Sequence, residues 1–184
     1  MSRPLITPTG HEIHFGENEV IVSKTDLRGI ITYTNDVFNK VSGYTNAEMI
    51  GQPHNLIRHP DMPRCIFRLL WETLEQGREI FAYVVNQAKN GGHYWVHAHV
   101  TASKDRNGKI IGYHSNRRCP YPDAIAQVIP LYRQLLQEEQ RHNSPETAIL
   151  ASTQMLNDLL ASKGVCYDEF VFSLSKYTCL ESSI

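Results

Sequence analysis

Three β-rich segments in close succession restrict the fold of this sequence more than any other feature. They span residues 79–87, 93–103 and 109–117 and are rich in β-branched and aromatic residues. The turns between them, Asn90-Gly91-Gly92 and Asp105-Arg106-Asn107-Gly108, have the composition of hairpin loops. Because strands joined by such loops pair with each other, the sequence predicts a three-stranded antiparallel meander.

Two further strands and a helical region precede the meander. Residues 19–23 and 30–33 predict a hairpin, since the turn residues 26–29 separate them. Short helices are predicted after the cap residue Asn35 or Asp36 and after Thr45, which has Glu48 three positions later in a capping-box pattern. Residues 52–63, rich in proline and polar groups, predict a loop or a helical turn, and residues 64–75 carry one apolar helical face. The predicted class is α+β: a five-stranded antiparallel sheet with helices on one face.

The pattern changes after residue 118. Apolar residues recur at helical spacing in residues 123–142, where Pro130 should kink the helix or mark its true start. A second helix begins at the Ser144-Pro145-Glu146 cap and ends at Gly164, and a short element spans residues 167–174. The two helices predict a C-terminal α-helical hairpin. We divide the chain into an N-terminal cap (1–18), a central domain (19–118) and a helical segment (119–184).

Composition excludes several classes of protein. Lys plus Arg (18) and Asp plus Glu (19) nearly balance, so bulk charge does not indicate a nucleic-acid partner. No run of about 18 apolar residues predicts a membrane span, and the N-terminus does not resemble a secretory signal, so we expect a cytoplasmic protein. The four cysteines are widely spaced and predict reduced thiols, with no metal site.

Local motifs sharpen the prediction. Residues 30–55, which include Ser42-Gly43-Tyr44 and Ile50-Gly51, resemble the first half of a PAS domain. The segment Ile57-Arg58-His59-Pro60-Asp61-Met62-Pro63, and Lys89-Asn90-Gly91 followed by His93-Tyr94-Trp95-Val96, resemble the PAS domain of bacterial aerotaxis receptors. The resemblance covers about residues 18–118, so it implies a PAS sensor domain at 19–118 and an output or dimerisation role for residues 119–184.

This resemblance implies non-covalent FAD inside the domain and a role as a redox or oxygen sensor of the aerotaxis type. Carried over residue by residue, it names four flavin-site residues and three further candidates. The four are Arg58, His59, Asp61 and Trp71, and the further candidates are Asn35, His54 and Asn86. The family normally continues into a membrane anchor and a chemoreceptor signalling domain, and these 184 residues contain neither.

The candidate residues also have chemistry suited to a flavin, each with a structural alternative. Trp71 can pack on a ring system or serve as a core residue. The Arg58 guanidinium can pair with a pyrophosphate or with Asp61. His59 can bond the cofactor or orient Asp61, and the amide of Asn86 can face the ring edge or point outward from its strand.

There are four alternatives to an FAD redox sensor. Light-oxygen-voltage photochemistry needs a cysteine just after the helix that Gly51 ends, and His54 stands there instead. Heme is an alternative, because five histidines are available, with His97 and His99 on one strand face; the others are His54, His59 and His93. FMN in place of FAD is a further alternative, and it would remove the pyrophosphate role of Arg58. A cofactor-free interaction module is the remaining alternative.

No nucleophile–base constellation or phosphate-binding loop supports an enzyme. We therefore expect a sensor that relays its state to a downstream signalling protein, namely a chemoreceptor, a kinase or a cyclic-dinucleotide enzyme. Homodimerisation through the C-terminal helices or through residues 1–18 is also expected.

Overall fold

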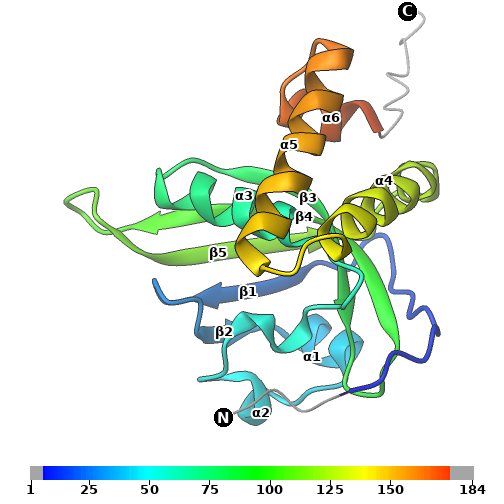
Figure 1. The fold of residues 1–184 in the computed structure, drawn as a ribbon. Coiled ribbons are helices and arrows are strands. Elements are labelled where there is room, and N and C mark those ends of the chain that lie inside the picture. Colours follow the sequence, from blue (N-terminus) through cyan, green and yellow to red (C-terminus); the bar gives the residue numbers. More distant parts are fainter. Residues whose placement is uncertain (1–5, 175–184) are drawn as a thin grey trace, which may run out of the picture.

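The computed structural model describes residues 6–174, and its centre is a five-stranded antiparallel sheet (Figure 1). The strands lie in the order β2-β1-β5-β4-β3. Their bounds are β1 Ile21–Thr25, β2 Ile31–Thr34, β3 Ile80–Gln87, β4 His93–Lys104 and β5 Ile110–Arg118. The hairpin and the meander predicted from the sequence are both confirmed, and β5 joins them by pairing with β1 on one side and β4 on the other.

Four helical segments between β2 and β3 lie on one side of the sheet. They are α1 Asp36–Ser42, α2 Asn46–Met49, the 3-10 helix His54–Ile57 and α3 Arg64–Glu75. The predicted caps are confirmed: the Asn35 side chain accepts from Phe38 N at 3.1 Å, and Thr45 and Glu48 form a capping box. These local hydrogen bonds fix where α1 and α2 begin, and so they place the loop and the 3-10 helix that follow.

The C-terminal segment forms the predicted helical hairpin and a third, shorter helix. The bounds are α4 Pro122–Gln140, α5 Pro145–Lys163 and α6 Tyr167–Leu174. Pro130 lies inside α4, so the alternative that it marks the start of the helix is wrong. Figure 1 shows α5 projecting away from the sheet, and α4 and α5 pack against each other.

The helices α4 and α6 extend the helical cover beyond the single face expected from the sequence. The rings of Tyr132 of α4 and Trp95 pack in a tilted arrangement with centroids 5.9 Å apart, and the Phe172 ring of α6 lies 4.8 Å from the Phe81 ring. In β4, Trp95 alternates with residues whose side chains face α3, so α4 and α6 cover the opposite face of β3 and β4. The C-terminal segment therefore wraps around the edge of the sheet that β3 forms.

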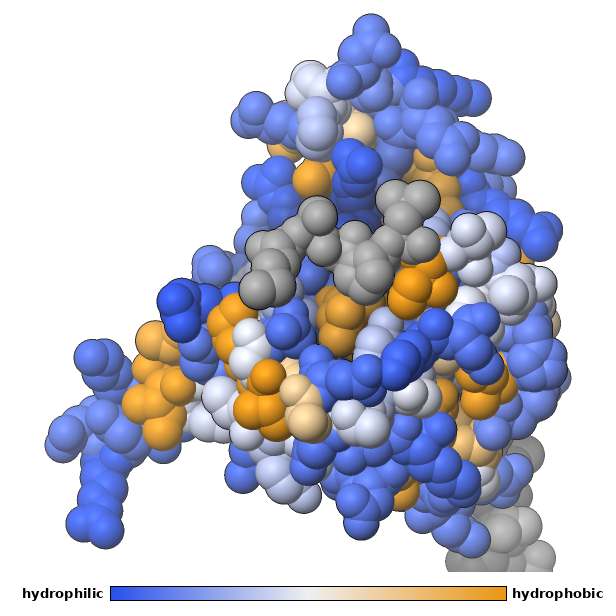
Figure 2. All heavy atoms as spheres, turned by 90° about the horizontal axis from the view of Figure 1, so that it is seen from below, coloured by the Kyte–Doolittle hydropathy of each residue, from blue (hydrophilic) through white to orange (hydrophobic). Residues whose placement is uncertain are grey.

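The N-terminal segment and the surface complete the fold. Residues 9–13 run along the β3–β4 turn, where Thr9 N donates to Gly91 O at 2.9 Å and Ile13 N to His93 O at 2.7 Å. Figure 2 shows that the underside of the molecule is mainly hydrophilic, with apolar residues in small, separate groups. Within residues 6–174, no helix combines the length and the apolar character needed to cross a membrane.

Candidate cofactor site

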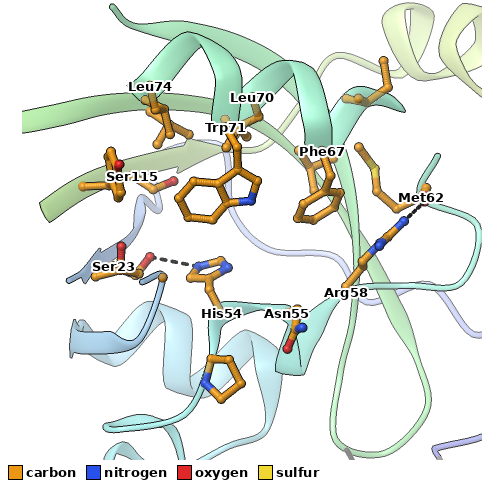
Figure 3. Close-up of a pocket in the computed structure, with 18 of the residues that line it drawn as sticks. Ser23, His54, Asn55, Arg58, Met62, Phe67, Leu70, Trp71, Leu74 and Ser115 are labelled. Carbon is orange, nitrogen blue, oxygen red and sulfur yellow. Dashed lines mark hydrogen bonds between the residues drawn. The ribbon is translucent and has the colours of Figure 1, made fainter. Parts of the chain in front are cut away.

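A cavity of about 500 Å³ lies between α3 and the sheet. This volume is within the range typical of cofactor sites. Much of its wall is apolar and comes from one face of α3 and from the facing strands: Ile66, Phe67, Leu70, Trp71, Leu74, Val84, Ala98 and Val100. Figure 3 shows Leu70 and Trp71 projecting from α3 toward His54, which stands on the other side of the cavity.

The inner end of the cavity holds a buried arginine. Arg117, only 2% exposed, donates from Nε to Ser115 Oγ at 3.0 Å and from Nη2 to His54 Nε2 at 3.2 Å and to Ser23 Oγ. Its guanidinium also lies 4.5 Å from the centre of the Phe38 ring. None of these partners is a carboxylate, and burial lowers the pKa of Arg117 to about 10.

His54 is held neutral by the same surroundings. Burial, and then the neighbouring Arg117 charge, lower the pKa of His54 to about 3. Because a guanidinium can only donate, the Nε2 atom of His54 accepts, and the ring proton of the neutral imidazole is on Nδ1. The polar end of the cavity is therefore a cation beside a neutral imidazole.

Three buried polar atoms of residues that line this cavity have no hydrogen-bond partner among the described residues. They are Nη1 of Arg117, Nδ2 of Asn86 and Oγ1 of Thr25. The first two are N–H donors and cannot accept. A buried donor without a partner is costly, by about 1–3 kcal/mol. The cavity is therefore complementary to a ligand that presents hydrogen-bond acceptors, such as carbonyl oxygens, next to a flat apolar body.

The outer part of the cavity is lined by arginines. Arg28, Arg64 and Arg68 are exposed, and Arg58 is half-buried. Two of them are already engaged with carboxylates: Arg28 with Asp26 at 3.2 Å and Arg68 with Glu72 at 2.6 Å. Guanidinium groups at a cavity rim suit phosphate oxygens, so the rim is complementary to an anionic tail on the ligand.

The structure brings four of the seven predicted site residues to this cavity: Arg58, Trp71, His54 and Asn86. The Arg58 guanidinium lies 4.7 Å from the Phe67 ring and donates to Met62 O at 2.9 Å (Figure 3). The backbones of Arg58 and Asn86 form a β-bridge. This bridge joins the loop that contains the motif of residues 57–63, here called the motif loop, to the edge strand β3. The indole of Trp71 stands edge-on to the Tyr113 ring, at 5.3 Å between centroids.

The other three predicted residues do not line the cavity. The Asn35 side chain caps α1 by accepting from Phe38 N, and it also accepts from Val22 N and donates to Val20 O. His59 is buried, and its Nδ1 accepts from Asp61 N at 3.1 Å, which closes the motif loop. The Asp61 side chain is 77% exposed. The hydrogen bonds of Asn35 and His59 described above are to backbone atoms, at the start of α1 and in the loop before α3. A cofactor role for these three residues stays a prediction.

Of the five histidines considered for heme, His54 lines the cavity, whereas His97 and His99 on β4 do not. Ala98 and Val100 line it, so His97 and His99, which alternate with them along β4, face the opposite side of the sheet. There His97 stacks on Tyr83 at 4.8 Å and His99 on Phe81 at 4.2 Å. The expectation that one of them approaches a heme iron is therefore not supported. Cys65 and Cys119 do not line the cavity.

Sequence reasoning missed Arg117, Ser23 and Thr25. Arg117 looks like a solvated residue at a strand end, because it lies between Asn116 and Arg118. The available signal was the period-two alternation of β5, which places Tyr113, Ser115 and Arg117 on one face, and all three line the cavity.

Comparisons with known proteins agree with this architecture. Residues 31–117 match the model of the PAS fold. The chain is 44% identical over 134 residues to the aerotaxis receptor of Escherichia coli, covering 73% of this chain and 26% of the receptor. It is 29% identical over 151 residues to the nitrogen fixation regulatory protein of Klebsiella pneumoniae, covering 81% of this chain and 30% of that protein. The chain thus spans under a third of the length of either relative.

Solved structures show the same fold. A light-oxygen-voltage domain studied with a flavin analogue aligns with a TM-score of 0.54 at 18% identity, over 62% of this chain and 86% of that one. A PAS domain from Colwellia psychrerythraea aligns with a TM-score of 0.51 at 24% identity, over 55% of this chain and 86% of that one. The strand order, the cavity beneath α3 and these likenesses together identify residues 31–117 as a PAS domain that resembles the one in aerotaxis receptors.

Proposed function

We propose that this chain is a flavin-binding redox sensor of the aerotaxis type, with FAD as its cofactor. The observation that carries the proposal is the pair of unpartnered N–H donors, from Arg117 and Asn86, on a cavity with a largely apolar wall. An isoalloxazine ring has carbonyl oxygens at one edge and an apolar body, so it fits both features. The resemblance to aerotaxis-receptor PAS domains supports the same cofactor.

The rim arginines support FAD over FMN. Arg58 is stacked on Phe67 and holds Met62 O, so its guanidinium has a fixed position beside the cavity opening. Arg64, which is exposed at the first position of α3, adds a second guanidinium. Two such groups suit the two linked phosphates of a dinucleotide, whereas FMN has a single terminal phosphate.

The cavity residues also supply a physical basis for sensing. A bound flavin supplies reversible one- or two-electron reduction, which changes the charge on the ligand. Arg117 is a permanent cation at the inner end of the cavity, so its attraction to the ligand becomes stronger as negative charge increases there. Arg117 also bonds Ser23 of β1 and His54, so any change in its hydrogen bonding is transmitted to the sheet and to the 3-10 helix.

We infer that the protein acts by binding and signalling, not by turnover. The helix α5 packs on α3, while α4 and α6 pack on the opposite face of the sheet. The C-terminal helices are therefore the proposed output surface toward a downstream signalling protein, and the proposed dimer contact. A cytoplasmic location is part of the same proposal.

The test is spectroscopic. The purified protein should show twin absorption bands near roughly 375 and 450 nm that bleach with dithionite, or should acquire them when FAD is added to colourless protein. Titration with riboflavin, FMN and FAD should give increasing affinity in that order, because each adds phosphate for the rim arginines. A single sharp band near roughly 400–430 nm would show heme instead. Failure of all three flavins to bind would refute the proposal.

A further inference from the structure

The helix that forms the cavity wall takes its N-terminal cap from the C-terminal segment. Pro63, the residue before α3, has no side-chain acceptor to offer the first turn. The carboxylate of Glu139, near the end of α4, takes that place, since its Oε1 atom accepts from Arg64 N at 2.7 Å and from Cys65 N at 3.2 Å. In the sequence, Glu139 lies 75 positions after Arg64 and 74 positions after Cys65.

The same carboxylate oxygen also binds α5. The Ser152 hydroxyl donates to Glu139 Oε1 at 3.1 Å, and Ser152 is fully buried while Glu139 is 7% exposed. One oxygen therefore holds three donors that come from α3 and α5, with α4 supplying the acceptor. One turn before Ser152, the side chain of Ile149 lines the cavity itself.

A buried carboxylate at this position acts on the whole of α3. The first N–H groups of a helix have no partner within the helix, and its N-terminus attracts negative charge. Hydrogen bonds from backbone N–H to a carboxylate are stronger than those to a neutral acceptor. The position and the order of Phe67, Leu70, Trp71 and Leu74, which α3 presents to the cavity, therefore depend on a residue outside the PAS core.

We propose that Glu139 is a positioning residue of the cofactor site, through which cofactor binding and the docking of α4 and α5 stabilise each other. The cofactor part of this inference rests on the proposed function. Because linkage is reciprocal, a ligand that orders α3 and contacts Ile149 strengthens the docking of α5, and loss of the Glu139 contacts weakens the binding of the ligand. The C-terminal helices would then report the state of the cavity through one carboxylate.

Two variants separate the cap from the link to α5. Glu139→Gln keeps the shape of the side chain and removes its charge, whereas Ser152→Ala removes the donor from α5 and leaves the cap on α3. Glu138→Gln is the matched control, because the same change one residue earlier affects only the ion pairs with Arg141 and His142. Circular dichroism and thermal unfolding establish that each variant is folded.

The readouts are the Kd for FAD, from titration into flavin-free protein, and amide exchange by NMR with and without FAD. In Glu139→Gln we expect a Kd about tenfold higher, which corresponds to about 1.4 kcal/mol, faster exchange of the Cys65 amide, and loss of the protection that FAD gives to α5. In Ser152→Ala the Cys65 amide should stay protected while the protection of α5 by FAD is lost. Glu138→Gln should match the original protein in all three measurements.

Unchanged FAD affinity and unchanged protection of α5 in both variants would overturn the inference. If the unmodified protein takes up no flavin, the proposed function fails and the cofactor part of this inference fails with it. The cap is tested even then, because exchange of the Cys65 amide in flavin-free protein must be faster in Glu139→Gln than in Glu138→Gln.

Discussion

Replacing Arg117 with Met should weaken flavin binding strongly while leaving the stability of the flavin-free protein almost unchanged. Met is an unbranched apolar side chain and fills the space along the Phe38 ring without a charge. The prediction separates a role in binding from a role in folding, because we expect the flavin affinity to fall while the stability of the flavin-free protein changes little.

The magnitudes follow from the surroundings of the guanidinium. Burial lowers the pKa of Arg117 to about 10, well below its ordinary value, and at about 1.4 kcal/mol per pKa unit this corresponds to roughly 3 kcal/mol against the charged form. The three hydrogen bonds to Ser115, Ser23 and His54 contribute about 1 kcal/mol each, so the two effects nearly cancel. We expect the free energy of unfolding of the flavin-free variant to change by less than about 1–2 kcal/mol. A hydrogen bond from a charged donor to the flavin is expected to contribute about 1.5–3 kcal/mol, so the Kd should rise roughly ten- to 150-fold.

Urea unfolding of flavin-free protein and fluorescence titration with FAD measure the two quantities on the same samples. Asn116→Ala, at the neighbouring strand position, serves as the control, since Asn116 does not line the cavity. Wild-type FAD affinity in the Arg117→Met variant would refute the assignment of the unpartnered Nη1 atom to a ligand. A fall in stability as large as the fall in affinity would show that Arg117 supports the fold and not the binding.

Three further predictions address the rim, the acid response and the sheet. Arg58→Ala should raise the Kd for FAD about tenfold and leave that for riboflavin unchanged, because riboflavin has no phosphate; equal loss for both ligands would contradict a phosphate role. His54 has a folded pKa of about 3 against 6.5 unfolded, so the unfolded chain binds the proton first as the pH falls. Stability should therefore decrease below about pH 6.5, at up to about 1.4 kcal/mol per pH unit from this residue, and urea unfolding of His54→Gln at pH 7 and 5 should show a smaller decrease. Gly112→Ala should destabilise the protein by several kcal/mol, since a Cβ atom would lie 2.3 Å from Thr25 O in the neighbouring strand; wild-type thermal stability would contradict this.

The elements of the fold were predictable because local signals define them. The Asn35 cap, the capping box at Thr45 and the apolar face of residues 64–75 all lie within a few residues of the structure that they specify. The polar half of the site was not predictable in this way. The alternation of β5 indicates the face on which Arg117 lies, but no local pattern indicates its partners, since Arg117 meets Ser23 across 94 positions. Asn35 and His59 were assigned to the cofactor because they belong to recognised motifs, whereas their hydrogen bonds serve the backbone.

The place of β5 in the sheet governs when this domain can form. Within residues 6–174, β5 is the last strand, and it lies between β1 and β4. Until residue 118 is available, the β1–β2 hairpin and the β3–β4 hairpin have no strand to join them, so the sheet closes through pairings of high sequence separation. Such pairings are slow to form because a long loop must close first. The pairing of β5 with β1 and β4 therefore completes the sheet and, in the same step, brings Arg117 to the cavity.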